Sequence, residues 1–172
     1  MFAAPLLPPL PRAFGVDARP AGRSMVDLLD EDHVLLAQLR ASARVEVFVA
    51  CLVRHLSAEA QYLYPTARRV LPAGQRLADA ALAVDRILLG DPLASAALNA
   101  HLSLGLHHKL RAALPEHDLI RLGNRVQIAE EAAPTRPHPG APATPPLNKL
   151  VDPALGVVDK IRDLLSGRST WP

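Results

Sequence analysis

The segment RHLSAEAQYLYP, residues 54–65, carries a histidine and a glutamate four residues apart, His55 and Glu59. On a helix such residues lie on one face, so an imidazole and a carboxylate could reach a single metal ion between helices. A carboxylate on a buried face costs several kcal/mol unless it is paired, protonated or bound to a metal, so Glu59 needs a partner. The same spacing also occurs by chance in many helices, and the simpler interpretation is a polar pair on a helix surface.

His33 favours the metal-site interpretation because it lies on the apolar face of the preceding predicted helix. A short connection would make the two helices antiparallel neighbours and bring His33 toward His55 and Glu59. Two histidines and one carboxylate form the set that suits a non-haem ferrous ion and leaves positions open for dioxygen or a small substrate. A lone histidine on such a face is more often a core residue, and the nearby Tyr62 and Tyr64 could either hydrogen-bond a ligand or only pack.

The elements that must position these residues are amphipathic helices. Ser24 followed by Asp27 resembles a capping box, and apolar residues at spacings of three and four predict a first helix over 24–40. A second helix is predicted over 43–71, with Pro65 as the point where it could bend. Both helices carry the candidate ligands on their apolar faces.

A third predicted helix also carries a carboxylate on its apolar face and ends at the sequence GDP. Its face consists of Leu77, Ala81, Asp85 and Leu88. Asp85 could complete a metal site, or it could be a surface charge paired with Arg86. The residue types alone leave both interpretations open.

A fourth helix is predicted over 92–114, and its sequence offers two candidate inward faces. One consists of Leu98, Leu102 and Leu106, and the other of His101, Leu104 and His108. If the histidine face turns inward, His101 and His108 could supply a displaced metal ligand or an axial ligand to a haem held in the bundle. His107 and His108 beside Lys109 could equally form a solvated face.

The two ends of the chain are richer in proline than its middle. Residues 1–23 are expected to form a flexible extension that is neither a signal peptide nor a membrane span. A short helix over 116–130 precedes the segment 131–149, which is predicted to be a Pro-rich linker on the surface. Residues 150–172 then predict a C-terminal helix with an apolar stripe that packs on the bundle or on a partner subunit, which would make a homodimer. The stripe consists of Val151, Leu155, Val158, Ile161 and Leu165.

Composition limits the fold class and excludes several functions. The chain has 172 residues, enough for one domain, and 49% of them are hydrophobic but only 3% aromatic, which favours an all-α fold. The net charge of +2 comes from scattered basic residues, which argues against nucleic acid as a partner. The single Cys51 excludes an internal disulfide, and no apolar run reaches the roughly 18 residues of a membrane helix. We therefore expect a cytoplasmic protein without a membrane partner.

Several motifs together resemble the hemerythrin-like family of HHE cation-binding proteins. They are LLDEDHVLLAQL in the first helix, RHLSAEAQYLYP in the second, and APTRPHPGAPATPP followed by NKLVDPALGVVDKIRDLL, so the resemblance covers about residues 24–167. It implies an antiparallel four-helix bundle over 24–130 with a non-haem di-iron centre that binds dioxygen or handles nitric oxide and peroxide. Matched motif to motif, the resemblance makes His33, His55 and Glu59 ligands of one iron.

The sequence departs from the family pattern in the third and fourth helices. Val84 and Asp85 stand where the family carries Glu and His, and Leu98 and Leu102 stand where it carries HxxxE. In the family these two helices mostly serve the second iron. The resemblance therefore implies one iron held by the three matching residues, with Asp85 as a further ligand.

The leading functional expectation is an iron protein that binds or activates dioxygen or a related small molecule, with an oxidative enzyme as one form of it. The altered ligand set leaves two other hypotheses open. One is a metal-free bundle that serves as a regulatory or assembly module, in which Leu98 and Leu102 simply fill the core. The other is a haem-binding bundle.

Overall fold

The computed structural model describes residues 22–142, 147–168 and 170, and this part of the chain consists of helices and loops without a strand. The elements are α1 (Met25–Ala41), α2 (Val45–Ala58), the π-helical turn η1 (Glu59–Leu63), α3 (Tyr64–Val70), α4 (Gly74–Gly90), α5 (Ser95–Ser103), α6 (Leu106–Ala113), α7 (Glu116–Ala132) and α8 (Asn148–Ser166). No helix among the described residues is long and apolar enough to cross a membrane. The predicted all-α fold is confirmed for these residues, whereas the extension expected over 1–23 lies almost wholly outside them.

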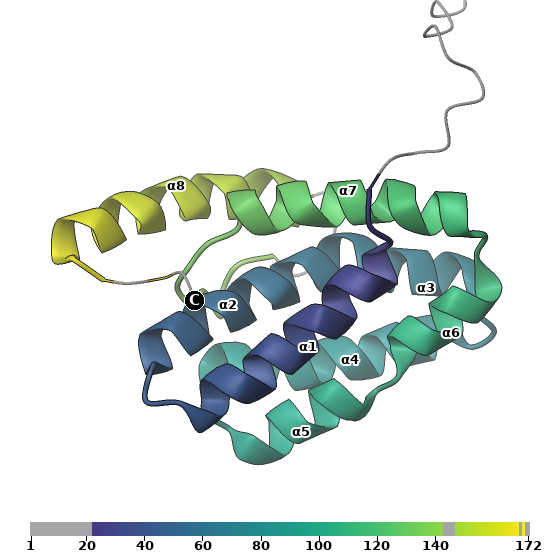
Figure 1. Ribbon diagram of the computed structural model, residues 1–172, viewed down its shortest axis with the longest axis horizontal. Coiled ribbons are helices and arrows are strands. Elements are labelled where there is room, and N and C mark those ends of the chain that lie inside the picture. Colours follow the sequence, from purple (N-terminus) through teal and green to yellow (C-terminus); the bar gives the residue numbers. More distant parts are fainter. Residues whose placement is uncertain (1–21, 143–146, 169, 171–172) are drawn as a thin grey trace, which may run out of the picture.

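The first helix begins at the predicted capping residue. The Ser24 hydroxyl accepts a hydrogen bond from the Asp27 N–H (3.1 Å) and donates one to the Asp27 carboxylate (2.6 Å). These bonds satisfy one of the N–H groups that the first turn leaves unpaired. α1 then leads through a short loop into α2, which returns along it (Figure 1).

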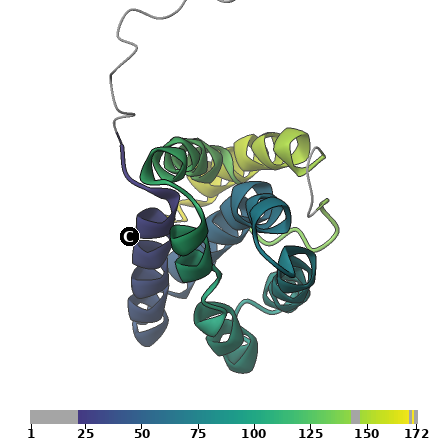
Figure 2. The same ribbon diagram turned by 90° about the vertical axis from the view of Figure 1, so that its right-hand side faces the viewer.

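The remaining helices surround this pair. α1 packs against α2, α6 and α7, and α4 packs against α3 and α5. Figure 1 shows α1 crossing in front of the run of α2 and α3, with α5 and α6 along the opposite edge from α7. In the end view of Figure 2, α7 and α8 lie side by side along one edge of the molecule.

Two hydrophobic clusters form the core. One includes Tyr64 and Leu110, and the other includes Phe48 and Leu98. Both clusters contain residues from the same four segments, which are α1, the α2–α3 run, α4 and the α5–α6 pair. In each segment a polar residue lies at or next to the boundary between the residues of one cluster and those of the other. These residues are His33, Glu59, Asp85 and His101. A polar layer therefore crosses the core between two apolar regions.

A π-helical turn interrupts the long helix predicted over 43–71, just before Pro65. Proline has no amide hydrogen and cannot bond to the carbonyl four residues earlier. The wider turn lets the Tyr64 N–H bond to the Glu59 carbonyl, five residues back. In a regular α-helix, residues five apart lie about 140° apart around the axis, so the π turn is what brings Tyr64 to the side of Glu59.

The prediction of a single helix over 92–114 is wrong, because the structure divides this segment into α5 and α6. Gly105 lies between them with φ of 61°, in the left-handed region that glycine adopts at little cost. The second helix therefore starts in a new direction. Residues on the two sides of the break can both face the core although a continuous helix would place them on different faces.

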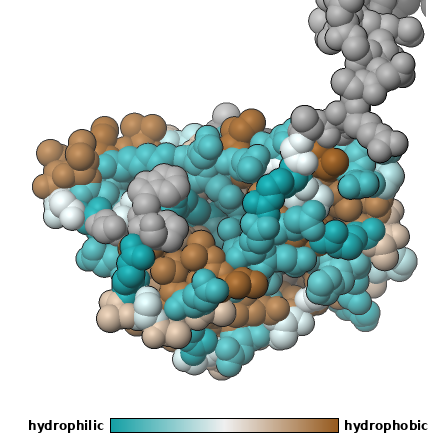
Figure 3. Space-filling view, in the orientation of Figure 1, coloured by the Kyte–Doolittle hydropathy of each residue, from teal (hydrophilic) through white to brown (hydrophobic). Residues whose placement is uncertain are grey.

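The C-terminal helix turns a different face to the bundle from the one predicted. Val158, Ile161 and Leu165 are 51%, 55% and 83% exposed, whereas Asp159 and Asp163 are buried. Of the two predicted places for the stripe, the bundle does not bury these three residues, and packing on a partner subunit stays a prediction. Figure 3 shows brown, apolar atoms gathered over the C-terminal half of α8.

Hydrogen bonds to the segment after α7 explain this orientation of α8. Asp159 Oδ2 accepts bonds of 3.2, 3.0 and 2.9 Å from the Thr135 N–H, the Arg136 N–H and His138 Nε2. Gly156 allows the close approach, since an added Cβ would lie 2.1 Å from the Ala132 carbonyl oxygen. Leaving these backbone N–H groups without an acceptor would cost more free energy than leaving the apolar stripe exposed.

We expect Asp159→Ala to lower the free energy of unfolding by about 2–3 kcal/mol, because it leaves buried N–H groups without an acceptor. Leu165→Ala on the exposed side of the same helix should change it by less than about 0.5 kcal/mol. Urea denaturation followed by circular dichroism measures both. The reverse order of effects would mean that α8 packs through its apolar stripe.

Candidate metal centre

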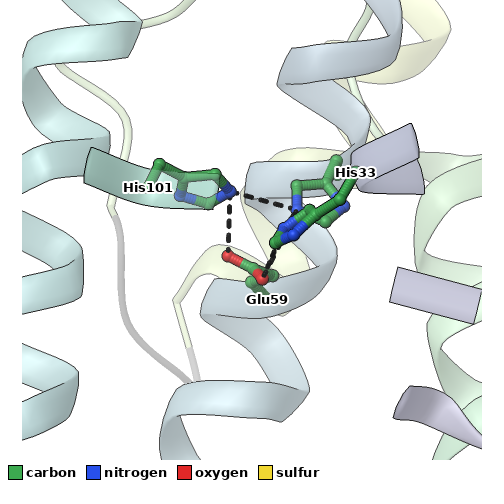
Figure 4. Close-up of side chains that lie close together, drawn as sticks. His33, Glu59 and His101 are labelled. Carbon is green, nitrogen blue, oxygen red and sulfur yellow. Dashed lines mark hydrogen bonds and ion pairs between the residues drawn. The ribbon is translucent and has the colours of Figure 1, made fainter. Parts of the chain in front are cut away.

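Three histidines and one glutamate from four elements converge in the polar layer. They are His33 of α1, His55 of α2, Glu59 of η1 and His101 of α5. Each offers a ligand atom, and these atoms all lie within 4.8 Å of one another, so the group could hold a metal ion. Figure 4 shows His33, Glu59 and His101 pointing toward one another from separate helices. The His33 side chain is 17% exposed, and the other three are buried.

The ligand atoms have nearly the spacing that one shared ion requires. Nε2 of His55 lies 3.1 Å from Nε2 of His33 and 3.2 Å from Nε2 of His101. Glu59 Oε1 is 3.4 Å from His55 Nε2, and Glu59 Oε2 is 3.7 Å from His101 Nε2. Two ligands with bonds of about 2.1 Å to one ion lie about 3.0 Å apart at a right angle and about 3.4 Å apart at the tetrahedral angle. Only small movements would therefore close the group around an ion.

Carboxylates on the far side of the rings orient His55 and His101. Nδ1 of His55 lies 3.2 Å from Asp32 Oδ2, and Nδ1 of His101 lies 3.0 Å from Asp85 Oδ1. These oxygens are acceptors, so each Nδ1 carries the hydrogen and donates it. Nε2 of each ring is then directed at the centre. Metal-binding histidines are commonly held in this way.

Without an ion, the contacts among these nitrogens cannot all be satisfied. A ring nitrogen carries either one hydrogen or one lone pair, so it makes one good hydrogen bond. His55 Nε2 faces two other Nε2 atoms, those of His33 and His101, and can satisfy only one of them. A cation that accepts a lone pair from each nitrogen would satisfy the contacts together, and this favours a metal ion in the centre.

The pKa values show how charge is balanced when no metal is bound. Burial disfavours the charged form of His55, but Glu59 and Asp32 outweigh it and hold the pKa of His55 well above its usual value. Burial also opposes the charge of Glu59, yet His55 and His101 keep the pKa of Glu59 well below its usual value. Burial and the nearby positive charge of His55 lower the pKa of His33 to about 3. A proton on His55 thus stands in for a cation, and metal binding should release it.

Tyr64 links two carboxyl groups beside the cluster. Its hydroxyl lies 2.6 Å from Glu59 Oε2 and 2.6 Å from Asp85 Oδ2. The hydroxyl has one hydrogen to donate, so one carboxyl group must be protonated and donate to it. Burial, with the negative charge of Glu59 added, raises the pKa of Asp85. We therefore assign the proton to Asp85, which donates to Tyr64, which donates to Glu59.

His107, to which the sequence assigned no ligand role, also enters the layer. It is buried, with Nε2 2.8 Å from Glu59 Oε1 and Nδ1 2.9 Å from Asp30 Oδ1. The signal that could have found it is Gly105, whose freedom to break the helix allows His101 and His107 to face the same centre.

The structure separates the remaining candidates. Asp85 contacts His101 and Tyr64 and is not one of the four converging residues. His108 is exposed, so the prediction that His101 and His108 share an inward face is wrong, because α6 turns at Gly105. The cavity beside the cluster has a volume of about 10 Å³, about the minimum for one water molecule, and this leaves no room for a haem there.

A second group of possible ligands shares His55. It consists of Asp32, His55 and Glu130, which line a separate pocket. Burial and the negative charge of Asp32 raise the pKa of Glu130 to about 8. Glu130 is therefore protonated at neutral pH and hydrogen-bonds Asp32, so this group holds the outer side of His55 in place.

Comparisons of this chain with protein-family models, with curated proteins and with solved structures give no match. They assign no family, and the hemerythrin-like resemblance remains a hypothesis. The contacts and distances described above are what supports a metal centre.

We expect His101→Ala to remove stoichiometric metal binding, because it takes one of four converging ligands from a buried site. His108→Ala removes the same side chain from the exposed side of the next helix and should leave metal content unchanged. Metal per chain is measured by elemental analysis after loading and gel filtration. Equal metal content in the two variants would contradict the site.

Glu130 predicts a pH dependence of stability. Its usual pKa is 4.5 and its pKa in the folded chain is about 8, so between these values the folded state holds a proton that the unfolded state has released. Stability should fall as pH rises through this window, by at most about 1.4 kcal/mol per pH unit. Glu130→Gln should flatten the profile, and Glu131→Gln at the exposed neighbour should not. Unfolding curves at several pH values test this, and identical profiles for all three proteins would refute it.

Proposed function

We propose that this protein is a hemerythrin-like, non-haem iron protein with one iron per chain, and that it binds or activates dioxygen or a related small molecule. The proposed ligands are His33, His55, Glu59 and His101. The observation that carries the proposal is the convergence of three Nε2 atoms, two pairs of them 3.1 and 3.2 Å apart, on one buried carboxylate.

The arrangement of the helices supports the hemerythrin-like part of the proposal. α1, the α2–α3 run, α4 and the α5–α6 pair are four long segments, which is the number that an antiparallel four-helix bundle needs. The converging side chains lie near the middle of three of these segments, and Asp85 lies on the fourth. Bundle cores hold metal sites by this means, with inward side chains from facing helices.

The ligand chemistry supports iron and a single ion. Imidazole and carboxylate ligands suit a non-haem ferrous ion, and four protein ligands leave positions open in an octahedral set. A bound ferrous ion supplies the ability to bind dioxygen or nitric oxide. Among the described residues no second group lies next to the first without sharing His55, and Leu98 is buried in the apolar core. His107 beside Glu59 is a further imidazole, but the described residues offer no second converging group of three there, and this favours a single ion.

The chain's own residues would prepare the site for this chemistry. Glu59 supplies the negative charge that a buried cation requires. Asp85 holds a proton one hydroxyl away from Glu59, through Tyr64, and so places a proton source beside the centre. The apolar clusters on both sides restrict the entry of water, which strengthens electrostatic interactions in the layer.

We expect Tyr64→Phe to retain about one iron per chain but to slow the oxidation of the ferrous protein by dioxygen at least about tenfold, because the proton path from Asp85 is cut. Tyr62→Phe is the matched control, since Tyr62 is half-buried and its ring faces Lys149. Stopped-flow absorption measures the rates. A ferrous form that binds neither dioxygen nor nitric oxide, or a protein that takes up zinc but no iron, would contradict the proposed function.

A further inference from the structure

Asp85 also lines a second cavity, which none of the four candidate ligands lines. It is bounded by α2 and α4 on one side and by the segment after α7 with the start of α8 on the other. Its volume is about 50 Å³, which exceeds the minimum for a single water molecule several times. Its walls are largely aliphatic, with Val53, Leu56, Leu82 and Leu89 among the lining residues.

Asn148 is the unexplained group in this cavity. The residue is 0% exposed, and among the described residues neither its amide nitrogen nor its amide oxygen has a hydrogen-bond partner. A buried unpaired amide is destabilising and is uncommon in native proteins. An occupant of the cavity that pairs with both atoms would remove this cost.

The two carboxyl groups that line the cavity are already engaged. Asp152 Oδ2 accepts hydrogen bonds from the Ser57 hydroxyl (2.5 Å) and the Gln61 amide (3.2 Å). Asp85 is held by His101 and Tyr64. The Asn148 amide is therefore the buried group left to recognise an occupant, since Arg86, which also lines the cavity, is exposed to solvent. An anion would lose its hydration among the aliphatic walls, so a neutral occupant is favoured.

We propose that this cavity binds a small neutral molecule with an aliphatic body and a carboxamide or hydroxyl head, which the unpaired amide of Asn148 recognises. Such a head both donates and accepts hydrogen bonds, as the two free atoms of the amide require. The aliphatic body matches the walls. Asp85 lines the cavity and also holds His101 at 3.0 Å, so an occupant lies one side chain away from the candidate ligands.

The binding itself does not depend on a metal. The further statement, that the bound molecule is the substrate of the iron centre, rests on the proposed function. The two statements are therefore tested in separate arms of one experiment.

The first arm uses metal-free full-length protein with isotope-labelled amides and the probe propionamide. We expect saturable shifts of the Asn148 side-chain NMR signal, with a Kd on the order of millimolar. Propionate, which has the same shape and a negative charge, should cause no such shift. Asn148→Leu should weaken propionamide binding at least tenfold without lowering the thermal midpoint, because it removes an unpaired buried amide. Asn99→Leu, on the exposed side of α5, is the matched control and should bind as the unchanged chain does.

Two results would overturn the cavity proposal. One is equal propionamide affinity in the unchanged chain and in Asn148→Leu. The other is the absence of any saturable shift together with a loss of stability in Asn148→Leu, which would mean that water alone fills the cavity and pairs with the amide.

The second arm compares cobalt-loaded with zinc-loaded protein. Faster relaxation of the propionamide protons with cobalt would place the occupant beside the metal centre and support its role as substrate. If propionamide binds but neither metal is retained, the proposed function fails and the cavity proposal stands.

Discussion

The structure depends on a buried polar layer in which every charged or polar group must have a partner. Four side chains that could each carry a charge, His33, His55, Glu59 and His101, lie together between two apolar clusters. In this low-dielectric interior an unpaired charge is far less favourable in free energy than at the surface, so each group needs a partner. Asp32 of α1, Asp85 of α4 and His107 of α6 are the partners of His55, His101 and Glu59. The apolar clusters on both sides of the layer hold these helices in place.

Two irregularities of the helices make this layer geometrically attainable. The π turn η1 brings Tyr64 round to Glu59, and the break at Gly105 lets His101 and His107 both turn inward. In a continuous α-helix, residues six apart would lie about 120° apart around the axis. Such departures from regular helix cost free energy and persist where the surrounding contacts require them, which is commonly at functional sites.

The C-terminal helix follows the same preference for satisfied polar groups over buried apolar area. Asp152, Asp159 and Asp163 of α8 face the rest of the chain and accept its hydrogen bonds, while Leu164 and Leu165 are 83% exposed. Asn148 on the same helix differs from these aspartates, since neither atom of its buried side-chain amide has a partner among the described residues. Asp159 leaves one carboxylate oxygen unpaired but accepts three bonds through the other, whereas neither atom of the Asn148 amide is paired, so this amide is the feature to be explained by binding.

Composition and apolar spacing were enough to predict an all-helical chain, the first two helices and the approach of His33 to His55 and Glu59, because local periodicity defines a helix and its buried face. The sequence also indicated His101 as a candidate but placed His108 with it. Only the tertiary structure decided that His107 turns inward instead, that Asp85 orients His101, and that α8 buries its aspartates. These outcomes depend on which backbone and side-chain groups from distant segments must be paired in the interior, and the order of residues along one helix does not contain that information.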